Sequence, residues 1–205
     1  MMTSNDTVTV LLCGVGGQGT ILAADLLAHA ALAAGTSVKV SEIHGMAQRG
    51  GAVTTVVRFG DEVPSMVCDP GTADCVVSFE TTEALRNLPF LAEDGYLLVA
   101  DEAIKPLPVA TGRASMPAHA RETLADLGAT LIPAGQLARE AGSAKSVNVV
   151  LLGALSTRLP FALEAWERIV ADRVPPKTVE ANLAAFRAGR AFALPADEKE
   201  EVREA

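Results

Sequence analysis

The stretch Val8-Thr-Val-Leu-Leu-Cys-Gly-Val-Gly-Gly-Gln-Gly19 is an apolar run that ends in clustered glycines and leads into an alanine-rich segment. This order predicts a strand, a tight turn and a helix. Gly14, Gly16 and Gly19 stand in the G-x-G-x-x-G spacing, in which glycines permit a sharp turn and close approach of a ligand to the backbone. Because the free N–H groups of the helix would point out of that turn, the stretch predicts an anion site. The same spacing is also compatible with glycines that serve helix packing alone.

The composition limits the classes of protein. A chain of 205 residues fits one α/β domain and is long enough to bury most of a core. Its net charge of −8 argues against nucleic acid as a partner, since phosphate neutralisation needs clustered Lys and Arg. No apolar run reaches the ~18 uncharged residues of a membrane helix, and the N-terminus lacks a basic region. We therefore expect a cytoplasmic protein with no membrane partner.

The cysteines of the chain argue against a metal site. The chain has three cysteines, Cys13, Cys68 and Cys75, and none stands in a C-x-x-C pair. An iron–sulfur cluster or a structural zinc site needs about four ligands, so we predict no metal site in this chain. No serine or cysteine stands beside an evident base, and we assign no catalytic residue to the chain.

The segment after the glycine turn predicts a β-α-β unit. A helix is expected over residues 20–34 and a short strand over 37–41, parallel to the first strand through a right-handed crossover. Glu42 then lies where a dinucleotide-binding fold places the carboxylate that holds a ribose, which favours NAD or a flavin. Residues 43–51 predict a glycine-rich loop and residues 52–59 an amphipathic strand. A doubly wound sheet would have a helix there, which counts against a dinucleotide.

The remaining chain predicts an α/β fold, a Rossmann-like sheet with mostly parallel strands flanked by helices, plus a C-terminal helical extension. Further strands are expected at 73–79, 96–100 and 129–133, with helices at 80–91, 120–127 and 136–141. Beyond residue 147 the pattern is helical only. We predict a Rossmann-like part at 1–145, a C-terminal helical part of the same domain at 146–194, and an acidic, disordered tail at 195–205.

Two motifs carry a resemblance to a known family, namely Gly14-Val-Gly-Gly-Gln-Gly19 and Ser41-Glu-Ile-His-Gly-Met-Ala-Gln-Arg-Gly-Gly51. Together they resemble the small (beta) subunit of indolepyruvate ferredoxin oxidoreductase, a stand-alone form of the gamma domain of 2-oxoacid:ferredoxin oxidoreductases. The resemblance continues through Asn148-Val-Val-Leu-Leu-Gly-Ala154 and Val174-Pro-Pro-Lys-Thr-Val-Glu-Ala-Asn-Leu183. The second motif is long and unusual enough to be specific, whereas the glycine turn alone would not be.

The resemblance implies a division of labour between subunits. Thiamine diphosphate and the 4Fe-4S clusters are expected in the large (alpha) subunit, and this chain is expected to bind no cofactor alone. Residues 1–145 would be the gamma domain that packs against that subunit and helps to form the site. The complex would convert indolepyruvate, or another aryl pyruvate, and coenzyme A to the acyl-CoA and carbon dioxide while reducing ferredoxin.

Arg49, beside Gly50 and Gly51, is the first candidate for a site residue. A guanidinium binds carboxylate or phosphate in a bidentate manner, and flanking glycines let backbone N–H groups approach the same anion. The resemblance places this loop toward the cofactor of the large subunit, where a 2-oxoacid carboxylate or the phosphates of coenzyme A must be held. An interface salt bridge is the structural alternative. The complete predicted substrate- or anion-binding set is Gly14, Gly16, Gly17, Gln18, Gly19, His44, Gln48, Arg49, Gly50 and Gly51.

Two rival functions remain open on the sequence alone. One is a stand-alone NAD- or flavin-binding reductase, favoured by the glycine spacing and Glu42. The other is a purely structural subunit, favoured by the lack of catalytic residues.

Overall fold

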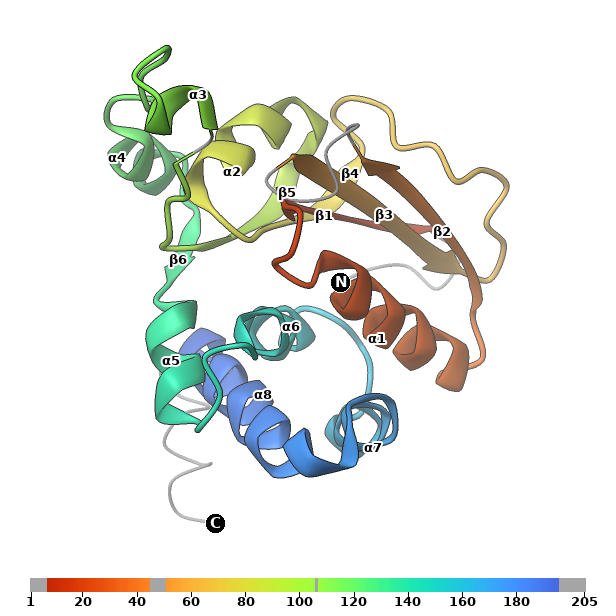
Figure 1. Ribbon diagram of the computed structural model, residues 1–205. Coiled ribbons are helices and arrows are strands. Elements are labelled where there is room, and N and C mark those ends of the chain that lie inside the picture. The colour runs from red at the N-terminus through yellow and green to blue at the C-terminus, as the bar shows by residue number, and fades with distance from the viewer. Residues whose placement is uncertain (1–6, 45–50, 106, 196–205) are drawn as a thin grey trace.

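The computed structural model describes residues 7–44, 51–105 and 107–195, without the side chains of His44, Leu107 and Pro108. Within these ranges a six-stranded sheet runs through the molecule in the order β2-β3-β1-β4-β5-β6 (Figure 1). Its strands are β1 (Val8–Val15), β2 (Ser37–His44), β3 (Ala52–Gly60), β4 (Ala73–Ser78), β5 (Leu91–Ala100) and β6 (Thr130–Ile132). The predicted acidic tail lies almost entirely outside the described residues.

Strands β1, β4, β5 and β6 are parallel neighbours, whereas β3 is antiparallel to both β1 and β2. The mostly parallel sheet is as predicted. Strands β1 and β2 are therefore parallel to each other, as expected of the β-α-β unit, although β3 lies between them in the sheet. A strand that returns directly after its predecessor pairs antiparallel, while a parallel neighbour needs a crossover. The second strand also continues to His44, three residues beyond the predicted end.

Helices cover both faces of the sheet. They are α1 (Thr20–Ala33), α2 (Thr81–Asn87), α3 (Leu107–Ala110), α4 (Ala120–Asp126), α5 (Ala134–Glu140), α6 (Val147–Ser156), α7 (Leu163–Arg173) and α8 (Val179–Ala193). Helices α1, α6, α7 and α8 lie on one side and α2 and α4 on the other (Figure 1). Successive residues of β1 alternate between the two cores, since side chains of a strand point to opposite faces. Val10 and Leu12 join the first core, and Leu11 and Cys13 the second.

The C-terminal helices share the larger core with the sheet and α1. Trp166 is fully buried and stacks at a tilt against Phe161 and Phe186, with ring centroids 5.8 and 5.9 Å apart. It is therefore a packing anchor of the larger core. In the described part of the chain, no helix has the length and apolarity needed to cross a bilayer.

Candidate functional site

The glycine turn between β1 and α1 adopts a backbone conformation that favours glycine. Gly17 and Gly19 have φ angles of 103° and 85°, in the left-handed region that other residues rarely enter. Gly19 is the N-cap of α1, and no described side chain caps that helix end. The first-turn N–H groups, which have no partner inside a helix, are therefore left to solvent or a ligand.

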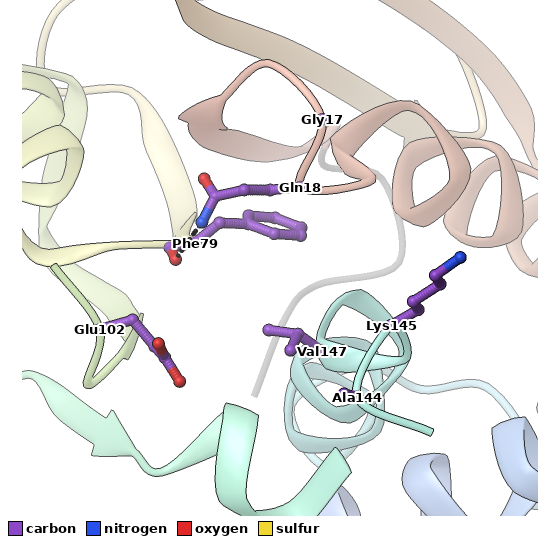
Figure 2. A pocket seen from close by; sticks show the side chains of 7 residues that line it. All are labelled: Gly17, Gln18, Phe79, Glu102, Ala144, Lys145 and Val147. Atoms are coloured by element: carbon purple, nitrogen blue, oxygen red, sulfur yellow. Dashed lines mark hydrogen bonds between the residues drawn. The ribbon is translucent and has the colours of Figure 1, made fainter. Parts of the chain in front are cut away.

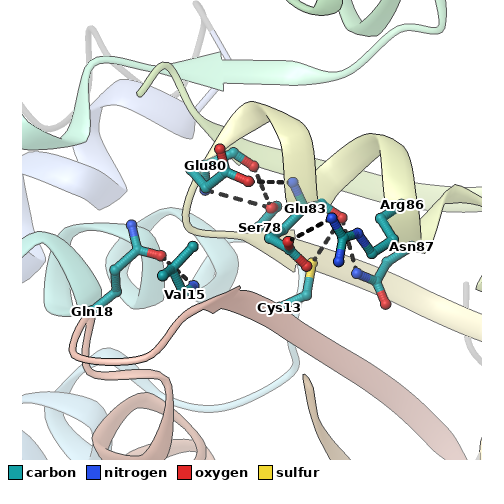
Figure 3. Close-up of polar contacts among 8 residues, drawn as sticks. All are labelled: Cys13, Val15, Gln18, Ser78, Glu80, Glu83, Arg86 and Asn87. Carbon is teal, nitrogen blue, oxygen red and sulfur yellow. Dashed lines mark hydrogen bonds and ion pairs between the residues drawn. The ribbon is translucent and has the colours of Figure 1, made fainter. Parts of the chain in front are cut away.

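Gln18 fastens the turn to the ends of two strands. Its Oε1 accepts a hydrogen bond of 2.6 Å from the Val15 N–H, and its Nε2 donates one of 2.9 Å to the Phe79 carbonyl (Figures 2 and 3). A Cβ on Gly14 would lie 2.7 Å from Gln18 Oε1 and 2.8 Å from Phe79 Cβ. Gly14 is therefore required because a neighbouring side chain occupies the space that its own would need.

A cavity of about 500 Å³ opens beside this turn at the carboxyl edge of the sheet, where open α/β sheets bind their ligands. We call it the carboxyl-edge pocket. Its walls are the glycine turn, the segments that follow β4 and β5, and the segment that leads into α6 (Figure 2). The lining residues are Gly17, Gln18, Phe79, Glu102, Ala144, Lys145 and Val147.

The pocket carries one charge of each sign on different walls. Lys145 precedes α6 and Glu102 follows β5, and both side chains are exposed (Figure 2). Sequence analysis missed both residues. The available signal was the place of each residue in the sequence. Lys145 lies shortly before the Asn148 motif, and Glu102 lies shortly after an apolar strand. Neither position alone shows that the two segments meet at the glycine turn.

The predicted site residues fall into three groups: those of the turn that line or support the pocket, those that join the loop after β2 to the turn, and those outside the described residues. Gly17 and Gln18 line the pocket, while Gly14 and Gly19 support the turn behind it. Gly16 donates its N–H to the Gly51 carbonyl at 2.9 Å, so the end of the loop after β2 lies against the turn. The third group is Gln48, Arg49, Gly50 and the side chain of His44, which lie outside the described residues.

Behind the end of β4, two buried glutamates organise the start of α2. Glu80 is fully buried, and its side chain accepts a hydrogen bond from the Glu83 N–H (Figure 3). Glu83 is 5% exposed, and burial raises the pKa of its carboxyl, although Arg86 lies 3.5 Å away. Within the described structure, one carboxylate oxygen of each glutamate has no hydrogen-bond partner. These acids therefore shape the strand end at a cost in stability.

The cysteines do not fit a metal centre. Burial raises the pKa of both Cys13 and Cys75 to about 12, so each is an unreactive thiol near neutral pH. Half-buried Cys68 also has a raised pKa, again mainly through burial. In the described ranges, no group of three His, Cys, Asp or Glu side chains could hold a metal ion.

Glu42 does not stand where a ribose-binding carboxylate would. It is exposed on β2, the edge strand, and β3 separates β2 from β1 and its glycine turn. In a dinucleotide-binding sheet the corresponding carboxylate follows the strand beside β1. The arrangement therefore lacks the geometry on which the NAD or flavin alternative rested.

The family of the chain follows from a match along nearly all of it. The model of the family described as pyruvate ferredoxin/flavodoxin oxidoreductase matches residues 9–192. The chain belongs to this family. The indolepyruvate oxidoreductase subunit IorB of Thermococcus kodakarensis is 40% identical over 187 residues, which cover 88% of this chain and 93% of the relative. The 2-oxoglutarate synthase subunit KorC of Methanothermobacter thermautotrophicus is 31% identical over 188 residues, 88% of this chain and 92% of the relative.

Solved structures show the same fold. The gamma subunit of keto/oxoacid ferredoxin oxidoreductase from Geobacter sulfurreducens superposes with a TM-score of 0.68 at 26% identity, covering 91% of this chain and 98% of that one. Pyruvate oxidoreductase subunit PORC from Thermotoga maritima gives a TM-score of 0.65 at 27% identity, covering 90% and 96%. The resemblance drawn from the glycine turn and the motif at 41–51 is thus confirmed, as is the fold class.

Proposed function

We propose that this chain is the small subunit of an indolepyruvate:ferredoxin oxidoreductase. The reaction would convert indolepyruvate, coenzyme A and oxidised ferredoxin to indoleacetyl-CoA, carbon dioxide and reduced ferredoxin. The observation that carries the proposal is the 40% identity to an indolepyruvate oxidoreductase subunit over 93% of its length. The identity to 2-oxoglutarate synthase subunits is lower, at 31% for the relative described above, which favours the aryl substrate.

We assign to this chain the binding of an acidic ligand at the carboxyl-edge pocket. The Lys145 ammonium supplies a positive charge, and the N-terminal ends of α1 and α6 flank the same space. Glu102 repels an anion from its own wall, so the negative group of the ligand is expected beside Lys145. Arg49 belongs to the same proposed set, together with Gln48, His44 and the glycines of both motifs. The acidic ligand would be the carboxylate of the 2-oxoacid or the phosphates of coenzyme A.

The redox chemistry is assigned to a larger partner subunit. Thiamine diphosphate, which supplies carbanion stabilisation, and 4Fe-4S clusters, which carry electrons, would both reside there. The chain has three cysteines, fewer than the four thiolates that a 4Fe-4S cluster takes, which supports that assignment. Ferredoxin would meet the complex through that partner. A cytoplasmic location stays a prediction.

The experiment that tests this function compares the purified chain with the chain co-expressed with its large subunit. The isolated chain, supplied with thiamine diphosphate, indolepyruvate, coenzyme A and ferredoxin, should be colourless and inactive. The complex should reduce ferredoxin with indolepyruvate in preference to 2-oxoglutarate. Turnover by the isolated chain, or tight binding of NAD or a flavin to it, would overturn the proposal in favour of a stand-alone reductase.

A further inference from the structure

The walls of the carboxyl-edge pocket come from segments that are far apart in the sequence. The glycine turn follows β1, Phe79 follows β4, and Lys145 and Val147 belong to the start of α6. No continuous helix or strand holds these three walls together. The shape of the pocket therefore depends on contacts between the walls.

Two side-chain amides make such contacts. Gln18 joins the glycine turn to the end of β4 through its bonds to Val15 and Phe79. Asn148, in the first turn of α6, donates from Nδ2 to the Gly19 carbonyl at 3.3 Å. Asn148 is 4% exposed, and a Cβ on Gly19 would lie 2.8 Å from its Nδ2. The turn is thus fastened on both sides.

The choice of amides has a physical reason. An amide both donates and accepts hydrogen bonds without carrying a net charge, so it can hold backbone groups together beside an anion site without adding a charge there. Asn148 follows Val147 directly but is not one of the seven lining residues. A change at Asn148 therefore reaches a ligand only through the position of the turn.

We propose that Asn148 and Gln18 are positioning residues that set the geometry of the carboxyl-edge pocket. Asn148 fixes the position of the N-terminal end of α1 relative to that of α6. This inference rests on the proposed ligand-binding function of that pocket. It gives a role to the Asn148 motif, which the family resemblance marks.

The chain offers a matched control for Asn148. Asn182 on α8 is 7% exposed and donates from Nδ2 to the Thr178 carbonyl at 2.8 Å. It has the same side chain, nearly the same burial and the same kind of bond, but its partner is Thr178 and not the glycine turn. Replacing either asparagine by alanine removes one buried side-chain bond to a backbone carbonyl.

The test measures melting temperature, kcat, and KM for indolepyruvate and for coenzyme A in the assembled complex. Asn148→Ala should raise one KM by about tenfold, which corresponds to ~1.4 kcal/mol, with kcat changed less. Asn182→Ala should lower the melting temperature without changing either KM. If Asn148→Ala fails to fold, Asn148→Leu keeps the volume and removes the donor, and the same KM shift is expected.

Unchanged KM values in a folded Asn148 variant would overturn the positioning role. Lys145→Ala serves as the reference for the proposed function itself. If Lys145→Ala raises a KM and the Asn148 variants do not, only the positioning role is wrong. If Lys145→Ala also leaves both KM values unchanged, the pocket is not the binding site and the ligand-binding role proposed for this chain fails with it.

Discussion

Glycines serve two regions of this molecule in opposite ways. Where α6 crosses α8, a Cβ on Gly153 would lie 2.8 Å from the Phe186 carbonyl carbon, and one on Gly189 would lie 2.7 Å from that of Val150. In the glycine turn, by contrast, Gly17 has a φ of 103° and no described atom near the position of a Cβ. The crossing needs glycine because two backbones touch. At Gly17 the turn needs it because of backbone conformation beside open space, and that space is where a ligand can approach.

The largest expected effect belongs to the crossing. Gly153→Ala should destabilise the chain by about 3 kcal/mol, because the helix backbones cannot move aside as a flexible side chain can. For a chain of this size the melting temperature should fall by roughly 6–12 °C, measured by calorimetry. Alanine normally stabilises a helix interior relative to glycine by about 0.5–1 kcal/mol. A neutral or raised melting temperature would show that the two backbones are not in contact.

A smaller effect is expected in the turn, and it should affect function as well as stability. Gly19→Ala faces both a positive φ and the Asn148 side chain, whereas Gly17→Ala faces only the positive φ. We expect a loss of roughly 1–3 kcal/mol, larger at Gly19 than at Gly17, measured by denaturant unfolding. Gly35, with a φ of 82° and open space around it, is the control.

The KM values of the assembled complex separate Gly19→Ala from Gly35→Ala. Gly19→Ala should raise a KM of the assembled complex, because it displaces the contact with Asn148. Gly35→Ala should leave KM unchanged at a similar loss of stability, since it lies at the far end of α1. Equal KM values for both variants would mean that the turn serves packing alone.

Two glutamates outside these regions, Glu83 on α2 and Glu167 on α7, should respond oppositely to pH. Burial raises the pKa of Glu83 above its ordinary value of 4.5, so the ionised form is disfavoured in the fold. Wild type should lose stability relative to Glu83→Gln as pH rises through and above 4.5. Glu167 on α7 has a lowered pKa because Arg187 on α8 donates to it. Wild type should therefore gain stability relative to Glu167→Gln as pH rises toward 4.5 from below, and should keep that gain at higher pH.

This contrast is measured from the melting temperatures of wild type and both glutamine variants, over a pH range that extends from well below to well above the ordinary carboxyl pKa of about 4.3. Parallel curves for Glu83→Gln and wild type would show that the buried carboxyl pays no ionisation penalty. Slopes of the same sign for both variants would contradict the assigned environments.

The sequence predicted the helices and strands better than it predicted which of them pair or pack with one another. The glycine turn was visible because strand, glycine and helix signals follow one another within one short stretch. The insertion of β3 between β1 and β2 was not, since alternating burial predicts a strand but not which strand it pairs with. The pocket was missed for the same reason. Lys145 and Glu102 meet the turn only through tertiary packing, and the partner of Gly153 in the helix crossing lies on another helix.

The smallest effect on stability is expected at the pocket cation, which makes it the cleanest measure of function. Lys145 is exposed, and a surface change of this kind usually alters stability by only ~0.5 kcal/mol. Loss of a charge-assisted contact to a bound anion costs nearer ~1.5–3 kcal/mol, or roughly ten- to a hundredfold in affinity. Arg49→Ala is expected to act in the same direction. Lys177, exposed and away from the pocket, is the control.

The central claim is that this chain holds an acidic ligand of the complex, and the KM values of the Lys145→Ala complex test it most directly. We predict that KM for indolepyruvate or for coenzyme A rises at least tenfold (~1.4 kcal/mol), while melting temperature and co-purification with the large subunit match those of Lys177→Ala. Unchanged KM values for both Lys145→Ala and Arg49→Ala would contradict the account and make the chain a structural subunit. Loss of the large subunit before any change in KM would identify the substituted residue as an interface contact.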